Sequence, residues 1–216
     1  MIITIDGPAG SGKSSAAKRV AERLGAAFLD TGAMYRAFTL AAMDEGAELE
    51  DEGALLDVVD KKEFHFDSGD GGMRVSIDGV DCTEDIRRGD VTGNVRYIAN
   101  SVEVRAKLVE LQREFAAEHE SIVTEGRDQG TVVFPDADFK FFLEADPAER
   151  ARRRHKELSE KGVDVDIARL EEDIRRRDES DINRSHSPLV KAEDAVEIDT
   201  TPLDLEGVVN KILSFI

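Results

Sequence analysis

Residues 1–14 read MIITIDGPAGSGKS, and this stretch decides the fold. Residues 2–5 are β-branched and mostly apolar, as in a buried strand. Residues 7–14 fit the pattern G-x-x-x-x-G-K-[ST], the loop that surrounds phosphate groups in many nucleotide-binding proteins. Apolar residues then recur at helical spacing over residues 16–24. The order strand, glycine-rich loop and helix is the context that the motif requires, so the stretch predicts a phosphate-binding turn in an α/β fold.

The spacing within this loop suits a phosphate ligand. Glycines let the backbone curl so that successive N–H groups point inward, and the helix that follows adds the positive end of its dipole. The Lys13 ammonium can reach the β- and γ-phosphates, and the Ser14 hydroxyl can bind Mg²⁺. Kinases, GTPases and motor-type ATPases share the motif, so it does not identify the reaction. The residues predicted to bind the nucleotide here are Gly7, Pro8, Ala9, Gly10, Ser11, Gly12, Lys13, Ser14 and Ser15.

Length and composition limit the class of protein. A chain of 216 residues is long enough for one domain with a packed core. The net charge of −18 argues against a sequence-independent nucleic-acid binder, which needs a basic face. The sequence has no leader pattern and no run of 18 or more apolar residues, so we expect a cytoplasmic protein without a membrane partner. Its single cysteine, Cys82, fits a reducing compartment, and we interpret it as structural.

The charges are distributed unevenly along the chain. Residues 44–60 contain many acidic residues and no basic ones, as on a solvated helical surface. Arginines concentrate instead in residues 150–154 and 169–184. Such clusters can bind a polyanion, or they can form salt bridges with the glutamates and aspartates interleaved with them on exposed helices. The charge pattern alone leaves both interpretations open.

Strand-like and helical segments alternate along most of the chain. The predicted strands are 2–5, 26–29, 121–124, 138–143 and 194–198, and the predicted helices are 13–24, 33–46, 100–118, 147–160, 166–178 and 203–215. This alternation predicts a doubly wound parallel sheet with helices on both faces. In such folds, ligands bind at the carboxyl edge of the sheet.

Residues 63–88 interrupt the alternation. Phe64 and Phe66 alternate with polar residues, the turn sequence GDGG follows at 69–72, and alternation resumes at Val75 and Ile77. This pattern predicts a small antiparallel insert. We therefore expect one domain over 1–216, made of a core (1–60, 100–146 and 186–216), a substrate-binding insert (about 61–99) and a helical lid (about 147–185).

Four charged clusters follow strands or end helices, where α/β proteins build their sites. They are residues 29–36 (LDTGAMYR), 125–130 (EGRDQG), 150–154 (RARRR) and 177–184 (RDESDINR). In the first cluster Thr31 is the predicted N-cap of a helix, and this would place Arg36 near the edge of the sheet.

The segments IDGPAGSGKSS, LDTGAMYR, EGRDQGTVVFPDA and RDESDINRSHSPL resemble the signatures of the bacterial cytidylate kinase family, in the same order and at similar distances. The resemblance covers essentially the whole chain and extends to the antiparallel insert. It implies a P-loop fold and phosphorylation of CMP and dCMP by ATP with Mg²⁺. It also implies a monomer whose partners are small-molecule substrates.

The resemblance also implies residue roles by motif position. Arg153 and Arg154 would belong to a lid that closes over ATP. Arg96 stands where the family often has a serine near the base, and Gln129 stands where it usually has methionine. The implied substrate residues are Thr31, Arg36, Arg105, Arg127, Asp128, Arg177, Asp181 and Arg184, and the implied catalytic residues are Lys13, Arg127, Arg177 and Arg184.

The chemical requirements of phosphoryl transfer to a nucleoside monophosphate agree with these roles. The phosphate of a nucleoside monophosphate has a second pKa of about 6 and is already ionised, so its phosphorylation needs no general base. The protein must instead position two polyanions and neutralise charge, for which arginine is suited. A carboxylate accepts from cytosine N4 and repels uracil O4, so we expect Asp128 to read the base with Arg105, and Asp181 to hold the ribose. An ion pair between Asp128 and Arg127 is the structural alternative.

Three other functions are compatible with a P-loop but have less support in the rest of the sequence. Another small-molecule kinase, acting on UMP, AMP or shikimate, would share the P-loop, but the insert and the EGRD cluster argue against it. A GTP-driven switch would need an N-K-x-D motif after a strand, which the sequence lacks. A non-catalytic nucleotide sensor is disfavoured by the complete set of phosphate-binding residues.

Overall fold

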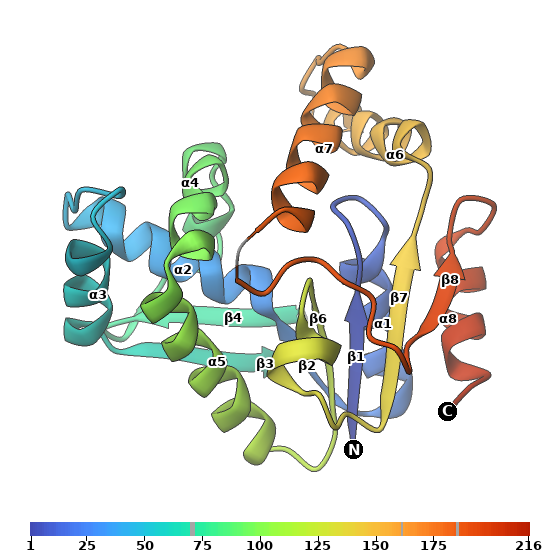
Figure 1. Cartoon of the computed structure of the whole chain (residues 1–216), viewed down its shortest axis with the longest axis horizontal. Helices are drawn as coiled ribbons and strands as arrows, with labels where there is room; N and C mark the ends of the chain where they lie inside the picture. Colours follow the sequence, from blue (N-terminus) through green and yellow to red (C-terminus); the bar gives the residue numbers. More distant parts are fainter. Residues whose placement is uncertain (70–71, 161, 185) are drawn as a thin grey trace. The chain divides into compact units, whose positions relative to one another are not determined.

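The computed structural model describes residues 1–69, 72–160, 162–184 and 186–216. Its larger sheet has the strand order β2-β6-β1-β7-β8, and β7 pairs in parallel with both β1 and β8 (Figure 1). The strands are β1 (Ile2–Asp6), β2 (Ala27–Asp30), β6 (Ile122–Gly126), β7 (Phe139–Glu144) and β8 (Val196–Asp199). Both ends of each strand lie within two residues of the ends predicted from the sequence. The predicted parallel sheet flanked by helices is confirmed.

The chain divides into two compact units, one formed by residues 1–25 with 123–216 and the other by residues 26–122. The predicted boundaries of the insert and the lid stay a prediction. No helix in the described part of the chain is both long enough and apolar enough to cross a membrane.

The first unit contains β1, β7 and β8 and the helices around them. Helix α1 buries one side, including Ala17 and Val20, because its apolar residues recur every three or four positions. Helix α8 packs on α1, and α6 packs on α7. The helices are α1 (Lys13–Leu24), α6 (Pro147–Glu160), α7 (Ile167–Ile182) and α8 (Leu205–Leu213), with one π-helical turn, η2 (Gln129–Val133).

The second unit holds a three-stranded antiparallel sheet in the order β3-β4-β5, as predicted for the insert. Phe66 pairs with Val75 across β3 and β4. Two residues of the predicted 69–72 turn, Asp70 and Gly71, lie outside the described residues. The elements are β3 (Phe64–Gly69), β4 (Gly72–Ile77), β5 (Val80–Asp81), α2 (Thr31–Asp44), α3 (Glu52–Lys61), a 3₁₀ turn η1 (Asp85–Arg87), α4 (Gly89–Asn100) and α5 (Val102–Ala117).

Several local features differ from the sequence prediction, among them the N-cap of α2 and the presence of α4. The N-cap of α2 is Asp30, whose carboxylate accepts a hydrogen bond from Ala33 N at 2.8 Å, so the prediction that Thr31 caps this helix was wrong. Thr31 is the first helical residue instead. Helix α4 was not predicted because Gly93 and its polar neighbours have low helix propensity. It forms because Val91 and Ile98 are fully buried.

The turn between β1 and α1 depends on glycine at its first position. Gly7 has a φ of +152°, and a Cβ there would overlap the carbonyl oxygen of Leu143. We expect Gly7→Ala to lower the free energy of unfolding by about 3 kcal/mol, because strained backbone and overpacking act together. Gly89→Ala is the matched control, since a Cβ at Gly89 meets open space. Urea unfolding curves that coincide for the two variants would contradict this expectation.

Candidate functional site

The phosphate-binding loop of the first unit leaves donors for a ligand. Gly12, in the left-handed conformation with φ 86°, is the N-cap of α1, and no described side chain caps this helix. The N–H groups of its first turn therefore lack the side-chain acceptor that usually satisfies them. Such a helix start favours an anion, through both its free N–H groups and its dipole.

Lys13 is buried at the start of the same helix. Its side chain is 9% exposed, and its ammonium donates to Pro8 O at 3.2 Å and lies 3.8 Å from Glu125 Oε2. Burial, together with the positive charge of Arg127, lowers the pKa of Lys13 to about 7, and Glu125 partly opposes that shift. A bound polyphosphate would favour the charged lysine.

Glu125 joins Lys13 to Ser14. The Ser14 hydroxyl donates to Glu125 Oε1 at 3.0 Å, and the buried Glu125 comes from strand β6. Sequence reasoning quoted the EGRD segment but did not assign Glu125 a role. An acidic residue at the carboxyl end of an apolar strand was the available signal. Hydroxyl and carboxylate oxygens are ligands that Mg²⁺ accepts, so these two side chains fit a magnesium site.

An ion-pair network in the first unit centres on Asp181. Arg127 Nε lies 2.7 Å from one oxygen of its carboxylate, and Arg184 Nη2 lies 2.6 Å from the other. Burial alone would raise the pKa of Asp181, but the guanidinium groups of Arg127, Arg184 and Arg177 outweigh burial and lower it. Arg127 and Arg177 also lie close enough to shift the pKa of Lys13. The structure thus brings together the four predicted catalytic residues, and buried Asp128 follows Arg127 in the chain.

Three further predicted residues lie in the second unit. Thr31 is buried at the start of α2. Arg36, one turn later, lies 3.4 Å from Asp30. Arg105 is buried on α5, and its guanidinium carbon stands 5.5 Å from the centre of the Tyr35 ring. Helices α2 and α5 of the second unit therefore carry these three residues, whereas the predicted catalytic residues belong to the first unit.

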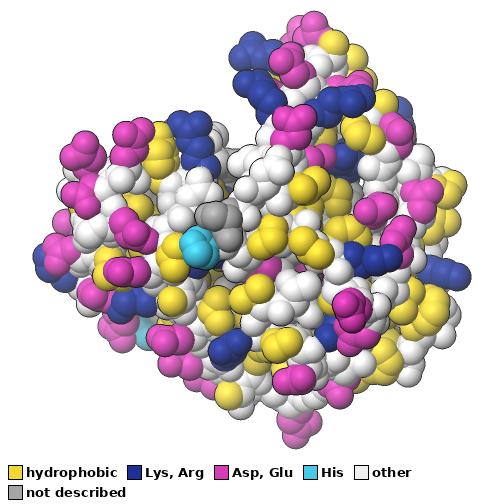
Figure 2. Space-filling view, in the orientation of Figure 1, with side chains coloured by type: hydrophobic (Ala, Val, Ile, Leu, Met, Phe, Trp, Pro, Cys, Tyr) yellow, Lys and Arg dark blue, Asp and Glu magenta, His cyan; other side chains and the backbone are white. Residues whose placement is uncertain are grey.

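The surface arginines of α6 and α7 mostly form salt bridges within their own helix, with partners three or four residues away. Figure 2 shows acidic and basic side chains interspersed over these helices. Arg154 pairs with Glu157, whereas Arg153 pairs with Glu149 and also donates to the backbone oxygen of Thr200.

Arg96 lies on α4 in the second unit. Its guanidinium donates a hydrogen bond to the hydroxyl of its neighbour Tyr97 at 2.9 Å.

Arg150, also in the arginine-rich segment, is buried rather than exposed. Its guanidinium donates to Ala145 O at 2.9 Å and to Ala9 O of the phosphate-binding loop at 2.9 Å. It also lies 2.7 Å from Asp178 Oδ2 on α7. Arg150 therefore ties the loop to both α6 and α7.

Removing Arg150 should destabilise the protein. We expect Arg150→Met to lower the free energy of unfolding by about 3 kcal/mol, because Asp178 would keep a largely buried charge without its partner. Arg152→Met is the matched control, since Arg152 is exposed and its partner Glu149 keeps its ion pair with Arg153, and the pairs of exposed charges contribute about 0–1 kcal/mol. Equal urea midpoints for the two variants would refute a structural role for Arg150.

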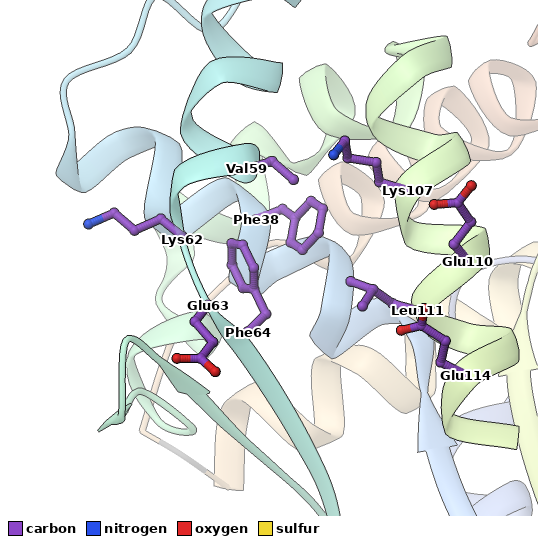
Figure 3. Close-up of a pocket in the computed structure, with 9 residues that line it drawn as sticks. All are labelled: Phe38, Val59, Lys62, Glu63, Phe64, Lys107, Glu110, Leu111 and Glu114. Atoms are coloured by element: carbon purple, nitrogen blue, oxygen red, sulfur yellow. The ribbon is translucent and has the colours of Figure 1, made fainter. Parts of the chain in front are cut away.

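The second unit contains a pocket of about 300 Å³, which is lined by residues outside the predicted site (Figure 3). The rings of Phe38 and Phe64 lie 4.3 Å apart at its apolar wall. Its lysines are paired, Lys62 with Glu45 and Lys107 with Asp60. None of the predicted site residues lines this pocket, so it is not the predicted nucleotide site.

Comparison with known proteins shows the family of this chain. A curated cytidylate kinase from Lactobacillus gasseri is 47% identical over 100% of this chain and 94% of the relative. One from Desulforamulus reducens is 48% identical over 99% of this chain and 96% of the relative. A solved structure of an uncharacterized protein from Eubacterium ventriosum covers 100% of this chain and 97% of its own, with a TM-score of 0.55 at 13% identity, and supports the fold alone. The family model for cytidylate kinase matches residues 3–216. The chain belongs to the cytidylate kinase family.

Proposed function

We propose that this protein transfers the γ-phosphoryl group of ATP to CMP or dCMP, giving CDP or dCDP and ADP, with Mg²⁺. The observation that carries the proposal is the buried Lys13, held at the phosphate-binding loop beside Arg127 and Arg177, in a chain that the family model matches almost throughout.

On the donor side, residues 7–15 surround the phosphates of ATP. Lys13 contacts the transferring γ-phosphate, and the Ser14 hydroxyl with the Glu125 carboxylate supplies oxygen ligands for Mg²⁺. When bound, the ion supplies positive charge to the β- and γ-phosphates. Arg153 and Arg154 belong to a lid that closes over ATP and excludes water.

On the acceptor side, arginines hold the phosphate of CMP. The Nε–H groups of Arg36 and Arg184 support this assignment, because both are buried and neither has a hydrogen-bond partner among the described residues. An unsatisfied buried donor costs about 1–3 kcal/mol, and a phosphate oxygen would satisfy it. The proposed substrate residues are Thr31, Arg36, Arg105, Arg127, Asp128, Arg177, Asp181 and Arg184.

The reaction needs positioning and charge neutralisation rather than proton removal. An ionised oxygen of CMP attacks the γ-phosphorus, the bond to the β-phosphate oxygen breaks, and ADP leaves. Lys13, Arg127, Arg177 and Arg184 neutralise the charge that develops on the transferring group. Asp128 accepts a hydrogen bond from cytosine N4, Arg105 donates to the base, and Asp181 holds the ribose.

The proposal includes a cytoplasmic monomer whose partners are small nucleotides. The net charge of −18 supports the exclusion of nucleic acid, because the phosphate backbone would be repelled.

A coupled ADP-release assay with Mg²⁺-ATP tests the function. The acceptors are CMP, dCMP, UMP, AMP, GMP and shikimate, each at the same concentration. Turnover with CMP and dCMP, and little with the others, is the expected result. Preferential turnover of any other acceptor would mean that the base-reading residues are misassigned, and no turnover with CMP or dCMP would refute the proposal.

A further inference from the structure

A buried carboxylate that is not among the proposed substrate and metal ligands lies at the end of β1. Asp6 is 4% exposed and immediately precedes the phosphate-binding loop. Its two carboxylate oxygens accept hydrogen bonds from two successive backbone N–H groups, Gln129 N at 3.0 Å and Gly130 N at 2.8 Å. These partners lie more than 120 residues away in the sequence. Both bonds are buried, so water does not compete for them.

The two N–H groups begin the π-helical turn η2, which follows directly after Arg127 and Asp128. No hydrogen bond from a described side chain caps this turn at its own N-cap residue, Asp128. The first N–H groups of any helical turn lack partners within it and need an outside acceptor. Asp6 supplies that acceptor from another element.

The surroundings leave the turn little freedom to move. A Cβ on Gly130 would meet Thr4 Oγ1 at 3.0 Å and Asp6 Oδ2 at 3.5 Å, so the backbone lies close against β1. The Gln129 side chain is fixed as well, because Thr124 Oγ1 donates to its Oε1 at 2.8 Å. Asp6 therefore supplies the charged acceptor for the backbone next to Asp128.

We propose that Asp6 is a positioning residue for acceptor recognition: its ionised carboxylate fixes the backbone at residues 129–130 and so holds Asp128 and Arg127 in place for CMP. This inference rests on the proposed function. Asp6 does not touch the nucleotide in this account and acts through the two amides.

The charges around Asp6 support this role. Burial raises the pKa of Asp6 to about 7, and the hydrogen bonds from the two backbone N–H groups oppose this shift. The negative charge of Asp128 raises the pKa further, and the positive charge of Arg127 lowers it. On the β7 side, Asp6 pairs with Phe142 along the strand, and the ammonium of Lys140 is held by Asp194. Because the pKa is raised from the ordinary value of 3.8 to about 7, the contribution of Asp6 to the free energy of unfolding falls as the pH rises between these two values and stays constant at higher pH. The carboxylate thus lowers stability at neutral pH while it holds the turn.

The test is Asp6→Asn, which keeps the shape of the side chain but replaces one acceptor with a donor. We expect KM for CMP at pH 8 to rise about tenfold, as for the loss of one hydrogen bond to a charged group, with KM for ATP changed less than twofold. As the pH falls below 7, KM for CMP should increase by a larger factor for the wild type than for Asp6→Asn. Comparing the two proteins at each pH removes the titration of CMP itself, whose second pKa is about 6.

The matched control is Asp136→Asn, the same change at an exposed aspartate of the same unit, which should leave both KM values unchanged. Hydrogen–deuterium exchange of the amides of Gln129 and Gly130, measured without nucleotide, should be about tenfold faster in Asp6→Asn. Unchanged exchange, a KM for CMP within twofold of the wild type, or parallel increases in both KM values would overturn the inference. Wild type that fails to phosphorylate CMP would refute the proposed function instead, and the exchange measurement would still test the contact.

Discussion

Replacing Lys13 by methionine is expected to lower kcat about 100- to 1000-fold, the largest effect of any single change considered. Methionine fills a similar volume but removes the ammonium that lies beside both Glu125 and Pro8 O at the phosphate-binding loop. The loss should fall on kcat more than on KM, because charge on the transferring group is greatest in the transition state. Steady-state kinetics with CMP and Mg²⁺-ATP measure this effect.

Lys61→Met is the control for Lys13→Met, since Lys61 is exposed and forms a surface ion pair with Asp57 four residues earlier. It should keep the wild-type kcat. Lys13→Met should also keep a cooperative urea transition, because Glu125 retains its hydrogen bond from Ser14. A folded Lys13→Met enzyme with kcat within tenfold of wild type would contradict the catalytic role of this lysine.

Replacing Asp128 by asparagine should change acceptor selectivity more than ATP binding. A carboxylate only accepts hydrogen bonds, whereas an amide can also donate one to uracil O4. We expect the ratio of kcat/KM for CMP to that for UMP to fall about 100-fold, in the range of one well-made base contact. KM for ATP should stay within twofold. Parallel assays with CMP and UMP give this ratio directly.

Asp136→Asn again serves as the control, because it makes the same chemical change at an exposed position. It should leave the CMP to UMP ratio unchanged. If Asp128→Asn keeps the wild-type ratio, Asp128 does not read the base. The ion pair with Arg127 would then be the better interpretation of this buried carboxylate.

Much of the fold could be predicted because its signals are local. The P-loop motif and the apolar run at residues 2–5 predicted β1 and α1 with bounds that differ by at most one residue. The alternating aromatic residues of the insert predicted its antiparallel strands. The N-cap of α2 was missed because Asp30 and Thr31 are adjacent and both residue types cap helices well. Helix α4 was missed because its burial comes from tertiary packing rather than from propensity.

The candidate site could be predicted only in part, because long-range contacts decide the roles of its charged residues. Arg150 lies in the same run as Arg152, yet one is buried against Ala9 and Asp178 while the other is exposed. No spacing rule distinguishes them. Glu125 and Asp6 share a signal that sequence alone does show, an acidic residue at the carboxyl end of an apolar strand. The partners of these carboxylates become visible only in the folded chain.

The most direct test of phosphoryl transfer by this protein is to follow the label from ATP carrying ³²P at its γ-phosphate, with CMP and Mg²⁺ and either wild type or Lys13→Met. Wild type is expected to place the label on the β-phosphate of CDP, with one ADP formed for each CDP, and Lys13→Met is expected to form labelled CDP at least about 100-fold more slowly. Release of the label as inorganic phosphate, without labelled CDP, would contradict phosphoryl transfer to CMP.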